Sequence, residues 1–170
     1  FSWLKAGQLL RFGGWVTVTS FVSPMMVILD RFVIGSLLGA KSVTYYTVPF
    51  QLAERSLLIP GSLTTALFPR FSAVSSNQEK MLASEAMNVL IVVMTPIIVT
   101  GVLLMNPFLT WWMGVEFAQK SSIVGQVTLV GFWVNGFARV PYAQLQARGK
   151  PGQVAKCHLL EVLPYFLMLY

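Results

Sequence analysis

The stretch "AMNVLIVVMTPIIVTGVLLMNPFLTWWMGV", residues 86–115, decides the fold class of this chain. Its thirty residues include no ionisable side chain. A helix needs roughly 20 apolar residues to cross a bilayer, and an apolar run of about 18 or more is the usual sign of a transmembrane helix. We therefore predict that this stretch is a membrane-spanning helix.

The composition of the whole chain also indicates a membrane protein. Hydrophobic residues make up 55% and charged residues 11% of the sequence, and the mean hydropathy is +0.68. A soluble domain carries about 25% charged residues, so this chain has too few to cover a soluble surface. We see no alternating segments of about ten residues, the pattern of barrel strands. The prediction is an all-α, polytopic transmembrane helix bundle.

Two classes of function are excluded by residue counts and positions. The net charge of +6 does not indicate nucleic-acid binding, because the basic residues fall between apolar segments rather than in one patch. The chain has one cysteine, Cys157, and one histidine, His158. Neither a disulfide framework nor a Cys- or His-rich metal site can be built from these, and we expect no metal and no cofactor.

About five apolar segments are long enough to be spans, separated by short polar turns. We expect them at residues 12–38, 43–68, 86–111, 121–146 and 154–170. Residues 1–11 are compatible with a short interfacial helix or a linker, and residues 72–80 with a polar loop. We expect residues 1–170 to be one membrane domain and a fragment of a longer protein.

Basic residues in the connecting segments predict the orientation. If the first span runs outward, seven basic residues lie in inner segments and two, Lys41 and Lys120, in outer ones. The seven are Lys5, Arg11, Arg70, Lys80, Arg148, Lys150 and Lys156. Cytoplasmic loops of membrane proteins carry an excess of Lys and Arg, so we expect Phe1 on the cytoplasmic side.

Four charged side chains interrupt the first two apolar segments, namely Asp30, Arg31, Glu54 and Arg55. Counted from a turn at Lys41, Asp30 and Arg55 lie roughly 16 and 21 Å deep at about 1.5 Å per residue. Both are then near the middle of the bilayer at similar heights, where a pair between them is compatible with the spacing. Each unpaired charge costs about 2.5–3.5 kcal/mol in lipid, so we expect these side chains to face a bundle interior or a wet cavity.

Polar residues recur at helical spacing beside these charges. Gln51 and Glu54 share a stripe in the second span, and Asn135 and Arg139 share one in the fourth. Arg139 lies about 10 Å before the inner end of its span, so snorkelling to the headgroups is an alternative for it. The candidate substrate-binding residues are Asp30, Arg31, Gln51, Glu54, Arg55, Asn135 and Arg139.

A cavity with more cations than carboxylates suits an anionic ligand. The guanidinium fork matches phosphate oxygens in a bidentate manner, which favours a phosphate-bearing substrate. The alternative is that the buried charges only pair helices in a structural or assembly protein.

The sequence resembles the polysaccharide-transporter branch of the multidrug/oligosaccharidyl-lipid/polysaccharide exporter superfamily, the O-antigen-type flippases. The matching motifs are Gly13-Gly14-Trp15, Leu29-Asp30-Arg31-Phe32, Tyr45-Tyr46-Thr47, Leu67-Phe68-Pro69, "LTWWMGVEFA" at 109–118 and "LQARGKP" at 145–151. The resemblance implies a two-lobed helical transporter around a cation-lined cavity. The chain would supply the seventh to eleventh helices, most of one lobe.

By the same resemblance, the protein moves undecaprenyl-diphosphate-linked oligosaccharides across the bacterial cytoplasmic (inner) membrane by alternating access. These units serve surface polysaccharide synthesis, such as the O-antigen of lipopolysaccharide. Arg31, Arg55 and Arg139 are carried over as cavity cations. The expected partners are the lipid-linked anionic oligosaccharide, membrane lipids, and H+ or Na+ as a coupling ion.

Two other functions remain to be weighed. A multidrug exporter of the same superfamily would need unpaired carboxylates, whereas Asp30 and Glu54 each stand beside an arginine. A membrane enzyme such as a glycosyltransferase would need a sizeable loop with acidic or histidine side chains. The longest loop expected here, residues 72–85, carries only Glu79 and Glu85, so we do not expect an enzyme.

Overall fold

The computed structural model describes residues 3–169, and in the first and last helices it describes only part of the side chains. Every described element is helical. The helices are α1 (Trp3–Leu38), α2 (Ala40–Glu54), the 3-10 helix η1 (Arg55–Leu57), α3 (Leu58–Ala73), α4 (Ser76–Met113), α5 (Val115–Ala147) and α6 (Pro151–Leu169). The predicted all-α membrane helix bundle is confirmed.

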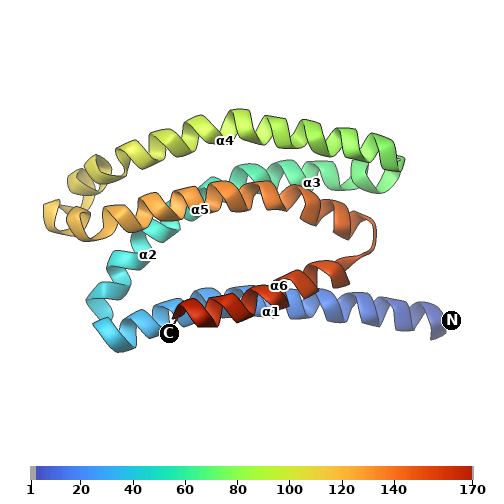
Figure 1. Cartoon of the computed structure of the whole chain (residues 1–170), viewed down its shortest axis with the longest axis horizontal. Coiled ribbons are helices and arrows are strands. Elements are labelled where there is room, and N and C mark those ends of the chain that lie inside the picture. The colour runs from blue at the N-terminus through green and yellow to red at the C-terminus, as the bar shows by residue number, and fades with distance from the viewer. Residues whose placement is uncertain (1–2, 170) are drawn as a thin grey trace.

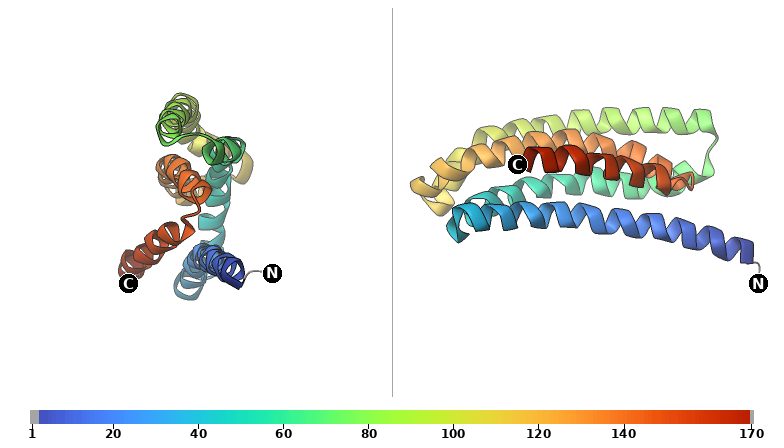
Figure 2. Two further views of the ribbon diagram at one scale, coloured as in Figure 1. Left: turned by 90° about the vertical axis from the view of Figure 1, so that its right-hand side faces the viewer. Right: turned by 60° about the horizontal axis from the view of Figure 1, so that its bottom comes forward.

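The helices run back and forth along one long axis, with α5 at the centre of the larger group (Figure 1). α5 packs against α4, α2 and α3, while α6 packs mainly against α1. Seen end-on in Figure 2, α1 and α6 lie side by side at one edge of the bundle, and α3 and α4 lie at the opposite edge. The bundle therefore consists of an α2–α5 group with an α1–α6 pair beside it.

The core lies where α4 and α5 meet α2 and α3. Its fully buried side chains include Ala53, Leu90, Leu109 and Val140. By contrast, α4 leaves large apolar side chains exposed on its outer face, with Leu103 71% exposed. α4 and α5 are long and apolar enough to cross a membrane, and their exposed apolar faces are what a bilayer would cover.

Two boundaries differ from the sequence-based expectation. α1 is continuous from Trp3, so residues 3–11 form neither a separate interfacial helix nor a linker. The polar loop expected at residues 72–80 shrinks to Val74 and Ser75. Here the Ser75 backbone N–H donates to the Gln78 side chain at 3.3 Å, the reciprocal contact of a capping box, and this contact starts α4 early.

Two glycine turns meet at one end of the bundle. Gly39 and Gly114 have φ values of 82° and 91°, which side chains other than glycine rarely adopt. Beyond these turns, Lys41 and Lys120 contact the Glu116 carboxylate at 3.4 and 3.0 Å. We call this the glycine-turn end.

At the opposite end, Glu79 is 3% exposed. Its Oε2 accepts a 2.8 Å hydrogen bond from Arg148 Nε and lies 2.6 Å from Arg148 Nη2. Gln144 donates a further hydrogen bond to Oε1 at 3.2 Å. These contacts join the start of α4 to the end of α5.

Candidate functional site

The predicted polar stripes converge on one groove of about 870 Å³ between the α2–η1–α3 helix and α5. We call it the arginine groove. Its lining residues are Gln51, Glu54, Arg55, Leu57, Leu58, Gly61, Ser62, Thr65, Ala66 and Arg139. It therefore contains four of the seven residues that the sequence predicted as a substrate site.

The 3-10 turn η1 interrupts the helix between α2 and α3, beside the groove. Pro60 has no backbone N–H, so it cannot donate to the Ser56 carbonyl four residues earlier. The chain tightens here into the 3-10 turn η1, in which the Leu58 N–H bonds to the Arg55 carbonyl. The Ser56 hydroxyl also donates to the Ala53 carbonyl at 2.7 Å. This turn places Glu54 and Arg55 at the junction between α2 and α3.

Arg139 enters the groove from α5 beside Gly61. A Cβ built on Gly61 would lie 3.6 Å from Arg139 Nη1, so the guanidinium rests against the backbone of α3. Arg139 lines the groove with Arg55, and its snorkelling to the headgroups stays an alternative prediction.

The two arginines of the groove form no ion pair with a carboxylate among the described residues. None of the ion pairs among the described residues involves Glu54, Arg55 or Arg139. The buried Nε of Arg139 has no hydrogen-bond partner. Two guanidinium groups and one carboxylate leave the groove with a net charge of +1, which favours an anion. A buried donor without a partner costs about 1–3 kcal/mol.

Asp30 and Arg31 form a separate cluster between α1, α2 and α6. Asp30 accepts hydrogen bonds from Tyr165 at 2.6 Å and from Tyr46 at 3.4 Å. The guanidinium of Arg31 lies 5.7 Å from the centre of the Phe50 ring, a cation–π distance. Its Nε is buried without a hydrogen-bond partner. The pair between Asp30 and Arg55 does not form, since Asp30 is held by the two tyrosines.

The expectation that Asp30 and Arg55 lie at similar heights is also wrong. The turn is centred on Gly39 rather than Lys41, so Asp30 lies about 14 Å and Arg55 about 24 Å from it along their helices. Arg31 sits at the level of Phe50, Arg55 five residues further along, and Arg139 at the level of Gly61. At about 1.5 Å per residue, the three arginines are staggered by about 8 and 9 Å.

One predicted site residue remains, and it lies outside the groove, whereas three polar residues near the two clusters were not predicted. Asn135 is exposed on α5, one turn before Arg139, and does not line the groove. Ser62 lines it but was not predicted. Tyr46 and Tyr165 were not predicted either, since a tyrosine in an apolar helix gives no sign of its partner.

Two smaller cavities lie towards the glycine-turn end. The first, which we call the tail groove, has a volume of about 440 Å³ and is lined by Leu52, Gly101, Leu104, Met105, Pro107, Phe108, Trp111 and Leu129. The second, which we call the head pocket, has a volume of about 290 Å³ and is lined by Lys41, Thr44, Tyr45, Met113, Glu116 and Phe117.

Comparison with known proteins identifies the family. The profile of the family described as "Polysaccharide biosynthesis protein" matches residues 1–123, which include α1 to α4 and the start of α5. The chain belongs to the polysaccharide biosynthesis protein family. The family match thus contains most of the arginine groove, while Arg139 lies beyond it.

A curated relative extends the likeness to the rest of the chain. The "Putative O-antigen transporter" of Shigella flexneri is 33% identical over 164 residues, or 96% of this chain. The chain spans 39% of the length of that relative. No solved structure matches the chain significantly. The family and this relative agree with the resemblance inferred from the motifs.

Proposed function

We propose that this chain forms part of a transporter that carries a lipid-linked, anionic oligosaccharide across a membrane for polysaccharide synthesis. The observation that carries the proposal is the arginine groove, in which Arg55 and Arg139 are accompanied by a single carboxylate, Glu54. Membership of a polysaccharide biosynthesis family supports it, as does the name of the Shigella flexneri relative.

The chemistry of the groove suits a diphosphate linkage. A guanidinium group presents two parallel N–H donors to phosphate oxygens and stays charged at any physiological pH. Gln51, Ser62 and Thr65 add neutral polar side chains along the groove, which suit sugar hydroxyls. In this proposal the phosphates contact Arg55 and Arg139, and Arg31 supplies a third cation nearer the glycine-turn end.

The wider mechanism belongs to the same proposal. The five predicted segments cross the bacterial cytoplasmic membrane, with the glycine-turn end outside. The chain supplies part of one lobe of a two-lobed protein, which works by alternating access with H+ or Na+ as a coupling ion. The chain transports rather than catalyses.

Complementation tests the proposal in the full-length transporter. The variants Arg55→Ala and Arg139→Ala are expressed in cells that lack the native protein, and surface polysaccharide and membrane abundance are both measured. Arg70→Ala is the matched control, because Arg70 is an exposed arginine at the end of α3 outside the groove. We expect both groove variants to lose polysaccharide at normal abundance, and the control to keep it.

Two outcomes would contradict the proposal. Loss of abundance in both groove variants would assign the arginines to helix pairing. Unchanged polysaccharide in both would remove the groove from the transport path. Thiol labelling adds an independent measure. In the full-length transporter with Cys157 and every other native cysteine replaced by serine, a cysteine at Thr65 should react with a polar reagent, and one at Leu103 on the exposed apolar face of α4 should not.

A further inference from the structure

We propose that the tail groove and the head pocket together bind one anionic phospholipid of the leaflet at the glycine-turn end. One acyl chain lies in the tail groove, and the phosphate contacts Lys41 and Lys120. This site is distinct from the arginine groove and does not depend on the transported substrate.

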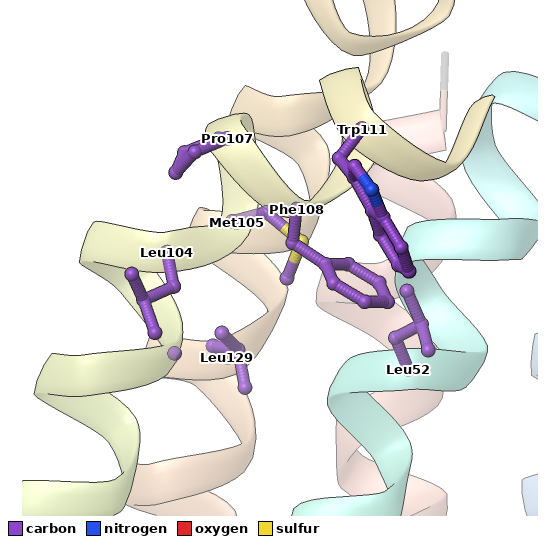
Figure 3. A pocket seen from close by; sticks show the side chains of 8 residues that line it. Leu52, Leu104, Met105, Pro107, Phe108, Trp111 and Leu129 are labelled. Atoms are coloured by element: carbon purple, nitrogen blue, oxygen red, sulfur yellow. The ribbon is translucent and has the colours of Figure 1, made fainter. Parts of the chain in front are cut away.

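The tail groove has the chemistry of a hydrocarbon site. All of its lining residues are apolar, and they come from α2, α4 and α5. Figure 3 shows Phe108 and Trp111 projecting from α4 towards Leu52 on α2, with Leu104 and Leu129 on the other side of the Phe108 ring from Leu52. α4 and α5 are each long and apolar enough to cross a membrane, so we expect lipid at the mouth of this groove.

The groove depends on a close approach of α4 and α5. A Cβ on Gly101 would lie 3.0 Å from a methyl group of Leu129, so glycine lets these helices meet at the floor. Above the floor, the Trp111 side chain is 82% exposed at the end of α4. Tryptophan is enriched at the membrane interface, which places the upper end of the groove at headgroup level.

The head pocket lies directly above the tail groove along α2. Lys41, Tyr45 and Leu52 are separated by four and seven residues, so they share one face of that helix. Lys41 and Tyr45 line the head pocket, and Leu52 lines the tail groove. On α4, Trp111 lines the groove and Met113, two residues later, lines the pocket. A lipid can therefore span both cavities along one continuous surface.

The charges above the groove favour an anionic headgroup. Lys41 and Lys120 share one carboxylate, Glu116, which leaves a net charge of +1. Their side chains remain 74% and 52% exposed, so both ammonium groups have donors free for a phosphate. The neighbouring Tyr45 phenol and the Glu116 carboxylate raise the pKa of Lys41, so Lys41 is charged at neutral pH. α2 and α5 also begin here, and helix N-termini attract anions.

Native mass spectrometry of the full-length transporter in mild detergent tests the site. Phosphatidylglycerol and phosphatidylcholine with the same acyl chains are added separately, and bound lipid is counted. We expect tighter binding of phosphatidylglycerol. Lys41→Gln combined with Lys120→Gln should weaken it by about tenfold, the effect of one charge-assisted hydrogen bond. Lys80→Gln, at the opposite end of α4, is the control and should bind as the wild type does.

Filling the groove gives a second readout. Leu104→Trp places an indole in the tail groove, whereas Leu103→Trp places the same indole outside it, on the neighbouring face of α4. We expect only Leu104→Trp to reduce bound phosphatidylglycerol, at unchanged membrane abundance. Equal lipid binding by both variants, or equal affinity for the two lipids, would overturn the proposal. Loss of abundance in Leu104→Trp alone would also overturn it, because a protein segment would then cover the groove.

Discussion

The phenol of Tyr165 on α6 donates a 2.6 Å hydrogen bond to the carboxylate of Asp30 on α1. The two residues are 135 positions apart in the sequence. Tyr46 on α2 adds a longer bond of 3.4 Å to the other carboxylate oxygen. The Asp30 carboxylate on α1 thus bonds to both α2 and α6. It adds a polar contact to the α1–α6 interface, which is the main packing contact of α6.

Removal of the Tyr165 hydroxyl should weaken this junction. Hydrogen bonds to charged groups contribute about 1.5–3 kcal/mol, so we expect Tyr165→Phe to lower the free energy of unfolding by about 2 kcal/mol. Tyr46→Phe, which loses the longer bond, should cost less. Thermal unfolding of the purified transporter measures both, and a larger effect for Tyr46→Phe would contradict the assignment.

Arg148→Ala should destabilise the end of the bundle opposite the glycine turns. Among the described residues, it leaves the buried Glu79 carboxylate with the Gln144 side chain as its remaining partner. Breaking a buried ion pair costs about 3–5 kcal/mol, and we expect about 3 kcal/mol because Arg148 is partly exposed. Lys150→Ala, an exposed neighbour, should change stability by less than about 0.5 kcal/mol. Equal unfolding transitions for the two variants would show that the pair contributes little.

Gly125→Ala should separate α5 from its neighbours. A Cβ at Gly125 would lie 2.8 Å from the sulfur of Met105 and 2.9 Å from Cβ of Pro49. Overpacking of this kind costs about 1–3 kcal/mol. Gly131→Ala is the matched control on the same helix, because nothing lies within 4 Å of its Cβ. It should be neutral or, through helix propensity, more stable by up to about 1 kcal/mol. The two variants should therefore change membrane abundance in opposite directions or by clearly different amounts.

Arg139→Lys separates charge from geometry in the proposed transport. Lysine keeps the positive charge but has no counterpart of the buried Nε–H and no planar fork. We expect surface polysaccharide to fall between the wild-type and Arg139→Ala levels, with a transport rate about tenfold below wild type if one charge-assisted bond is lost. Full activity of Arg139→Lys would show that charge alone is sufficient at this position.

Much of the fold could be predicted from local sequence. The uncharged stretch at residues 86–115 lies almost entirely within α4, because a run of that length leaves a helix as the way to satisfy its backbone in lipid. The predicted segment at 43–68 was harder, because it is two helices joined by η1. Pro60 indicated a disturbance, but the sequence does not state whether a proline kinks a helix or breaks it.

The candidate site was only partly predictable, because its geometry depends on how whole helices rotate. Arg55 was expected to be a buried cation, and Arg139 either a cavity cation or a snorkelling one, but their convergence depends on the packing of α5 against α3. Asn135 shares the stripe of Arg139 but does not line the groove. Glu79 was expected in a loop and is instead buried. Local sequence could not show this, because its partner Arg148 lies 69 residues away.

The 3-10 turn at Arg55–Leu57 has a mechanical consequence. An unbroken α-helix resists local bending, because each backbone carbonyl accepts a hydrogen bond from the N–H four residues later. Here that series of hydrogen bonds is interrupted beside Pro60, so we expect the chain to bend more readily at η1 than within α2 or α3. The bend would lie at Arg55, so a ligand bound by Arg55 would sit where α2 and α3 meet.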